Sequence, residues 1–164
     1  MCIIYNIYKM KYYISTFYNT RYFQPHQIGI STAVFQPKYW KYEQNKNGAV
    51  MGICEPLLSS AKLSEEVICQ RDCQHKNVVP KCPFLISYRE YLETIDFEKL
   101  IAEFERIANE VKKINNYQQE PEIVLLVYEA VNNPCSERLG LVKFFAEHGI
   151  ELKEWTKDRS GLIF

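Results

Sequence analysis

The sequence predicts a three-layer, Rossmann-like α/β domain, with a partly parallel sheet and helices on both faces. Two observations carry this prediction. Residues 123–128 form an unbroken apolar run of strand length, which is typical of a central parallel strand covered on both faces. Residues 97–114 place apolar side chains at intervals of three and four, which is the spacing of an amphipathic helix. Strands that alternate with such helices favour a layered α/β architecture.

Length and composition fit one globular domain. The chain has 164 residues, of which 47% are hydrophobic and 24% are charged, so a core can form without disulfides. We assign the domain to residues 10–155 and interpret residues 1–9 as an N-terminal extension, because Met10 is an equally good start. Residues 156–164 are expected to be a tail, and the polar residues 64–83 to be a loop or an insertion.

The first half of the domain contributes two short strands. Residues 12–18 and 28–34 are rich in aromatic and β-branched side chains, which favour strands. Asn47-Gly48 predicts a turn, and residues 57–66 could hold one short helix.

The second half is predicted to be mostly helical. Residues 84–93 predict one helix, and Asp96 is placed to cap the next. A third helix is expected to begin at Asn133-Pro134, with proline at its first position, and to end at His148-Gly149. Residues 150–155 then predict a parallel strand that follows a right-handed crossover.

Charge and cysteine content narrow the functional classes. The 20 basic and 20 acidic residues cancel, which argues against general nucleic-acid binding but leaves a local basic patch open. No run reaches the about 20 apolar residues that a membrane span needs, and no secretory leader is recognisable. Six cysteines without a leader favour a cytoplasmic protein with reduced thiols.

The loop after residues 123–128 concentrates reactive side chains. Glu129 follows the predicted central strand, at the edge where α/β proteins bind ligands, and is a candidate general base. Cys135 lies near the predicted helix start, whose dipole would lower a thiol pKa, and is a candidate nucleophile. Ser136 and Arg138 are candidate ligands for an anion. The alternative is a buried structural cysteine with solvated or paired neighbours. A phosphatase loop is excluded, because its arginine position holds Leu141.

A second group of candidates follows the first two strands. Arg21, Lys38 and Trp40 could converge on the same edge of the sheet if those strands are parallel neighbours. A guanidinium beside aromatic rings suits an anionic group joined to a flat ring, as in a nucleotide. Aromatic side chains scattered through a tyrosine-rich chain are the simpler explanation.

A third group could bind a metal. Cys69, Cys73, His75 and Cys82 are four potential zinc ligands within the predicted loop. Their spacing does not match the usual Cys-x2-Cys knuckles, so unpaired, reduced cysteines are favoured over zinc.

Several of these segments resemble one protein family, called domain-of-unknown-function family 488, which occurs in bacteria, archaea and phages. The resemblance covers residues 10–155 and is strongest after Tyr91. It implies an α/β fold and a site at the loop after residue 128, without a reaction. This chain departs from the family pattern by Val127, where many members have cysteine, and by Cys-Ser-Glu-Arg in place of Cys-His-Arg. The similar segments are 12–16 with Arg21, 29–34, 92–104, 124–129, 134–138 and 147–150.

The leading functional hypothesis is a protein that binds a small anionic, nucleotide-like molecule at the strand–loop–helix site and could act on it. A non-enzymatic alternative is a ligand-sequestering or partner-binding accessory protein of the phage type. Nucleic-acid association ranks third, because the net charge is zero.

Overall fold

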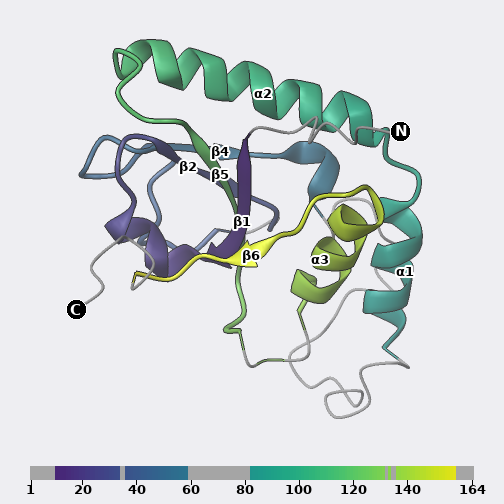
Figure 1. Ribbon diagram of the computed structural model, residues 1–164. Helices are drawn as coiled ribbons and strands as arrows, with labels where there is room; N and C mark the ends of the chain where they lie inside the picture. The colour runs from purple at the N-terminus through teal and green to yellow at the C-terminus, as the bar shows by residue number, and fades with distance from the viewer. Residues whose placement is uncertain (1–9, 34–35, 59–81, 132, 134–135, 158–164) are drawn as a thin grey trace, which may run out of the picture.

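The computed structural model describes residues 10–33, 36–58, 82–131, 133 and 136–157 of the chain. Within these residues, strands form one six-stranded sheet in the order β3-β4-β2-β5-β1-β6 (Figure 1). All neighbouring pairs are parallel except β3 with β4. The strands are β1 (Lys11–Thr16), β2 (Gln27–Ser31), β3 (Glu43–Gln44), β4 (Val50–Ile53), β5 (Glu122–Val127) and β6 (Lys153–Glu154).

The strand β5 occupies the centre of the sheet. Its residues from Ile123 to Val127 are fully buried, and its edges pair with β1 on one side and β2 on the other. Leu125 is thereby flanked by Ile14 and Ile30. An apolar run without polar alternation suits such a position, because both faces of the strand are covered. The prediction of a central parallel strand is confirmed.

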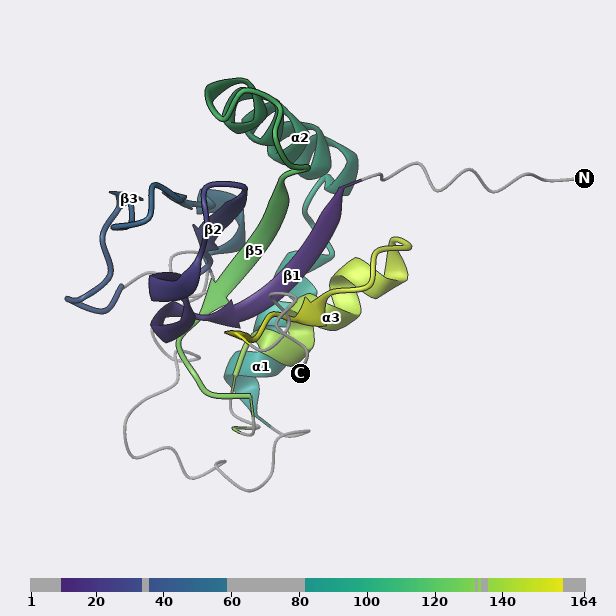
Figure 2. The same cartoon turned by 60° about the vertical axis from the view of Figure 1, so that its left-hand side comes forward.

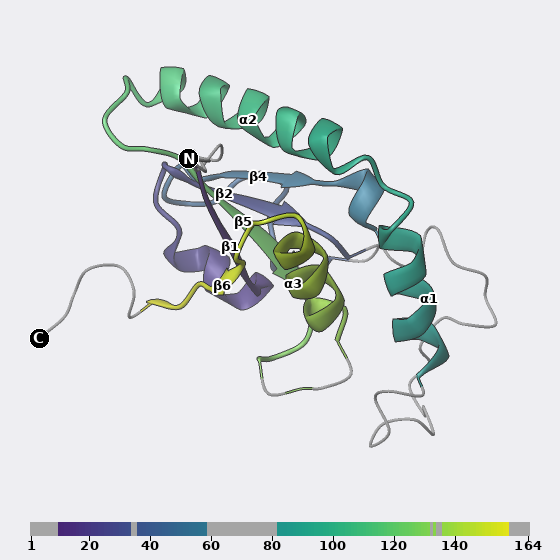
Figure 3. The same cartoon turned by 45° about the vertical axis from the view of Figure 1, so that its right-hand side comes forward.

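The three α-helices pack on one face of this sheet. They are α1 (Pro83–Leu92), α2 (Phe97–Ile114) and α3 (Arg138–Glu147). In Figures 1 and 3, α2 runs across the sheet while α1 and α3 lie side by side. The α2 helix begins where expected, because the Asp96 carboxylate accepts a hydrogen bond from the Lys99 N–H at 3.1 Å.

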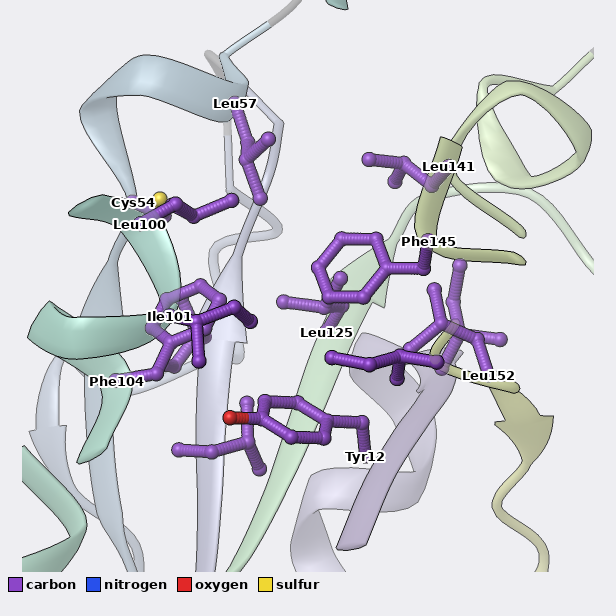
Figure 4. Close-up of a cluster of buried hydrophobic side chains, with 14 of the residues drawn as sticks. Tyr12, Cys54, Leu57, Leu100, Ile101, Phe104, Leu125, Leu141, Phe145 and Leu152 are labelled. Atoms are coloured by element: carbon purple, nitrogen blue, oxygen red, sulfur yellow. The ribbon is translucent and has the colours of Figure 1, made fainter. Parts of the chain in front are cut away.

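The larger hydrophobic cluster fills the space between these helices and the sheet (Figure 4). Leu125 of β5 faces Phe145 of α3, while Ile101 and Phe104 enter from α2. The Tyr12 ring contacts Phe104 and Phe145 with centroid separations of 6.3 and 6.1 Å. Aromatic side chains from three elements therefore close one core.

The opposite face of the sheet is covered by a 3-10 helix, η1 (Phe17–Tyr22), and by the loops that follow β2. Here Val124 and Leu126 of β5 belong to a second cluster of buried side chains. Edge-to-face ring contacts join Phe17 to Trp40 at 5.3 Å and Phe23 to Trp155 at 4.6 Å. Figure 2 shows the purple turns of η1 on the side of the strands away from α1 and α3. The predicted three-layer α/β fold with a mostly parallel sheet is confirmed, and its second face carries a 3-10 helix and loops in place of α-helices.

Two strands end earlier than the sequence predicts. β1 stops at Thr16, because the chain then turns into η1, where the Thr20 hydroxyl donates to the Phe17 carbonyl at 2.7 Å. β2 stops at Ser31, and the next residue, Thr32, donates both its N–H and its hydroxyl to the Leu126 carbonyl, at 3.1 and 3.0 Å. Of the helix expected in residues 57–66, only Leu57 and Leu58 are described, and Leu57 ends the short 3-10 turn η2 (Glu55–Leu57).

The start of α3 was predicted wrongly. The helix begins at Arg138, not at Asn133-Pro134. Before it the chain makes turns, in which Asn133 donates to the Ala130 carbonyl and the Ser136 hydroxyl accepts from the Arg138 N–H. The bond to Ser136 occupies the Arg138 N–H, which a helix starting near residue 133 would need for its own backbone bond.

The last strand is parallel, as expected, but it is short and pairs with β1. Both edges of β5 are already occupied, so the chain leaving α3 reaches the next free edge. In the described part of the chain, no helix combines the length and apolar character that crossing a membrane requires.

Candidate functional site

The predicted loop site lies at the carboxyl end of β5, where Ser136 links two elements. Its hydroxyl donates to the Glu129 carboxylate at 3.0 Å and accepts from the Arg138 N–H at 3.1 Å. Ser136 is 1% exposed; its bond to the Arg138 N–H is buried, and its bond to the Glu129 carboxylate is partly buried. The structure thus brings Glu129, Ser136 and Arg138 together, as the sequence predicted.

The Arg138 guanidinium is buried, and most of its hydrogen-bonding capacity is used internally. Its Nε donates to the Glu154 carboxylate at 2.6 Å, and its Nη1 donates to the Glu129 carbonyl at 3.1 Å. Nη2 is also buried and has no partner among the described residues. Burial raises the pKa of Glu154, and the neighbouring Arg138 opposes that rise. Arg138 therefore ties β5, α3 and β6 together.

Glu137 adds a third carboxyl group to this region. It is buried beside Arg138, and its pKa is raised to about 7. Loss of hydration on burial is the largest cause, and the negative charge of Glu129 adds to it. The Arg138 guanidinium is therefore paired with the Glu154 carboxylate and has Glu137 as its neighbour, while the Glu129 carboxylate bonds to Ser136. Because this arrangement disfavours a further negative charge, the described contacts of Ser136 and Arg138 are explained without an anionic ligand.

Several predicted residues fall outside the described part of the chain. Cys135 is one of them, and α3 begins three residues after it. The proposed zinc ligands Cys69, Cys73 and His75 also lie outside. The fourth, Cys82, is a buried free thiol just before α1.

A different region brings the second group of candidates together. Arg21 and Trp40 line one cavity of about 290 Å³, which lies on the η1 face of the sheet. Lys38 is exposed and is not part of the lining. β1 and β2 are parallel, as the prediction required, but β5 lies between them.

This cavity combines positive charge with aromatic walls. Its described lining holds three cations and four aromatic rings, and no carboxylate. Within the described residues, none of these cations forms an ion pair. Their positive charge is therefore not cancelled locally. The cations are Arg21, Lys41 and Lys46, and the rings belong to Phe17, Tyr18, Tyr39 and Trp40.

Arg21 is held in place by its own 3-10 turn. Its guanidinium carbon lies 3.7 Å from the centroid of the Tyr18 ring, and its Nε donates to the Tyr18 carbonyl at 3.1 Å. Partial burial raises the pKa of Tyr39, and the charge of Arg21 opposes that rise. Arg21 is thus stacked on one tyrosine and close to another, which is a favourable geometry for a cation–π contact.

Lys46 is positioned by the asparagines on either side of it. The Asn45 side chain donates to the carbonyls of Thr20 and Phe23 at 2.8 and 3.0 Å. Asn47 donates to the carbonyls of Arg21 and Phe23, both at 3.1 Å. The turn between β3 and β4 is thereby attached to η1, and Lys46 lies beside Arg21 at the cavity wall.

Trp40 brings a buried polar group to the same wall. The residue is 8% exposed, and its indole N–H has no hydrogen-bond partner in the described residues. Buried hydrogen-bond donors nearly always have an acceptor. The Trp40 indole N–H could therefore gain an acceptor from a bound molecule.

Sequence reasoning missed Lys41 and Lys46. The signal for Lys46 was the turn Asn45-Lys46-Asn47-Gly48, in which Gly48 has φ of +87°. A turn rich in asparagine can bond to backbone carbonyls elsewhere, but its partner on η1 is more than 20 residues away in sequence.

Comparisons with known proteins give no further guide. No family model, no curated protein and no solved structure matches the chain.

The internal role of Arg138 can be tested by its effect on stability. Arg138→Ala is expected to lower the free energy of unfolding by about 3 kcal/mol, because it leaves the Glu154 carboxylate without its cation. Urea unfolding can be compared for Arg138→Ala, Glu154→Gln and the double variant. The double variant should lose less free energy of unfolding than the two single variants lose together. Arg106→Ala, which removes two exposed ion pairs, serves as the control and should cost much less. Equal losses at the two arginines would contradict a structural role for Arg138.

Glu137 predicts a pH-dependent stability. Its folded-state pKa of about 7 lies above the ordinary value of 4.5, so the folded protein keeps a proton that the unfolded chain releases between these values. Its stabilising contribution is therefore present below about pH 4.5 and is lost as the pH rises through about 7. Glu137→Gln should remove this loss, which is on the order of 3 kcal/mol. The midpoints of urea unfolding between pH 5 and 8 measure this loss of stability. The control Glu151→Gln, at an exposed position, should show the same pH dependence as the wild type.

Proposed function

We propose that this protein binds a small anionic molecule that carries a flat ring, of the nucleotide type, in the cavity lined by Arg21, Trp40 and Lys46. The observation that carries this proposal is the lining itself, with three unpaired cations, four aromatic rings and no carboxylate among the described residues. A ring that stacks on tyrosine or tryptophan and a phosphate that pairs with arginine would use both features at once.

The local geometry supports a site that is formed before the ligand arrives. Arg21 is held by Tyr18, and Lys46 is held by two asparagines that bond to η1. The Arg21 side chain, held against Tyr18, loses less freedom on binding, so more of its contact energy contributes to affinity. For Lys46, the asparagine bonds fix the backbone of the turn that carries it. A volume of about 290 Å³ suits one small molecule.

The proposal concerns binding and names no reaction. Glu129 and Ser136 are hydrogen-bonded to each other, and Arg138 is committed to Glu154. Tyr128, which immediately precedes Glu129, contacts Phe17 of the cavity with a ring separation of 5.9 Å. An enzymatic role for Glu129 would therefore have to act from the border of this cavity. Cys135 lies outside the described residues. A ligand-sequestering role needs only the cavity.

Membership of domain-of-unknown-function family 488 is a second part of the proposal. Its support is the set of sequence segments that resemble the family, among them the loop that leads to Arg138. The parallel α/β sheet is the architecture that the resemblance implies. The family adds no ligand, so the binding proposal depends on the cavity alone.

Titration calorimetry with the four ribonucleoside 5′-monophosphates tests the binding proposal. At least one should bind more tightly than its nucleoside or than ribose 5-phosphate, because ring and phosphate then contribute together. Arg21→Ala and Lys41→Ala are each expected to weaken that binding about tenfold, the effect of losing one charge-assisted hydrogen bond.

Lys113→Ala is the matched control, because Lys113 is an exposed cation in the last turn of α2, on the other face of the sheet. It should leave the affinity unchanged. The proposal is overturned if no monophosphate binds, or if all three variants weaken binding equally.

A further inference from the structure

A second, larger cavity adjoins the first. It has a volume of about 680 Å³ and is lined by the amino ends of β2 and β5, by η1 and by the residues that follow β6. Arg21 and Lys46 line both cavities. The two hollows therefore share a wall made of two cations, which we call the Arg21–Lys46 ridge.

The second cavity, like the first, combines a cation with an aromatic ring. The Lys157 ammonium lies 4.7 Å from the centroid of the Tyr22 ring, and both residues line this cavity. Its other polar lining is mainly uncharged amides: Gln24, Gln27, Asn47 and Gln119. Its carboxylate, Glu122, lies 3.6 Å from the His26 imidazole.

The tyrosine rings continue from one cavity into the next. The Tyr18 ring, in the first cavity, contacts the Tyr22 ring, in the second, with centroids 6.5 Å apart. Arg21 stacks on Tyr18, and Lys157 lies over Tyr22. Cations and rings therefore alternate along η1, across the ridge.

A single nucleotide bound in the first cavity does not contact the second cavity. A ligand that carries repeated phosphates and repeated flat rings would place a phosphate on the ridge and one base in each cavity. Single-stranded nucleic acid has this repeat, and proteins bind it by combining a positively charged groove with stacking rings. A net charge of zero does not oppose such binding, because the four cations are gathered on one face.

We propose that the ligand of this protein is a single-stranded oligonucleotide that spans both cavities, with the phosphate between two nucleotides bound by Arg21 and Lys46. This inference rests on the proposed function, because the first cavity must hold one nucleotide. Double-stranded nucleic acid is disfavoured, since paired bases cannot enter two separate hollows.

Fluorescence anisotropy with a labelled uridine octanucleotide tests the inference, with competition by unlabelled mono-, di- and tetranucleotides. The dinucleotide should compete at least about tenfold better than the mononucleotide, because it adds one stacked base. A thymidine octanucleotide in a parallel titration separates RNA from DNA as the source of this chemistry. A hairpin duplex should compete poorly.

Variants separate the two cavities. Lys157→Ala and Tyr22→Leu should remove the advantage of the dinucleotide and leave the mononucleotide affinity unchanged, because both residues line the second cavity alone. Lys41→Ala should weaken the binding of both the mononucleotide and the dinucleotide, and Lys113→Ala should weaken the binding of neither. In a salt titration, removing one cation that binds a phosphate should lower the slope of log affinity against log salt by about 0.7.

The outcomes distinguish the inference from the function on which it rests. If mononucleotides bind and a second nucleotide adds no affinity, the oligonucleotide inference is wrong and the binding proposal stands. If neither mononucleotides nor oligonucleotides bind, both are wrong. A dinucleotide advantage that survives Lys157→Ala and Tyr22→Leu would also overturn the inference, because the second cavity would not be its source.

Discussion

The complete burial of β5 is the constraint on which the rest of the structure depends. Both faces of this strand are covered and both of its edges are paired, so every later or earlier element must be arranged around it. The chain between β1 and β2 has to cross a face of β5, and η1 makes that crossing. The chain after α3 finds no free edge on β5 and pairs with β1 instead. The position of Arg21 is therefore a consequence of how the central strand is buried.

The two polar regions of the protein differ in how their charges are compensated. At the end of β5, the buried Arg138 pairs with the Glu154 carboxylate, and its bonds to Glu154 and to the Glu129 carbonyl hold three elements together. On the η1 face, cations stand beside aromatic rings and have no acidic partners among the described residues. The buried Arg138–Glu154 pair holds the fold together, whereas cations in a hollow without acidic partners are available to a ligand.

Asparagine side chains join the two segments that carry the cations of the η1 face. Asn45 and Asn47 bond to carbonyls of η1 and so attach the turn that carries Lys46 to the crossing segment that carries Arg21. Two cations from distant parts of the chain are thereby held side by side. The same arrangement divides one surface into two adjoining cavities, which gives a repeating ligand a place for more than one unit.

The sequence by itself determined the elements whose signal is local. The sequence correctly predicted the buried strand β5 and the amphipathic helix α2 with its Asp96 cap. Both signals lie in consecutive residues, as an apolar run and as a helical spacing of apolar side chains. The sequence also identified Arg21 and Trp40 as partners, and Glu129 with Arg138. Only the tertiary structure decided where α3 begins, which strand β6 joins, and that Lys46 stands beside Arg21. These outcomes depend on which edges of β5 are free and on hydrogen bonds between segments more than 20 residues apart, and no local pattern encodes such contacts.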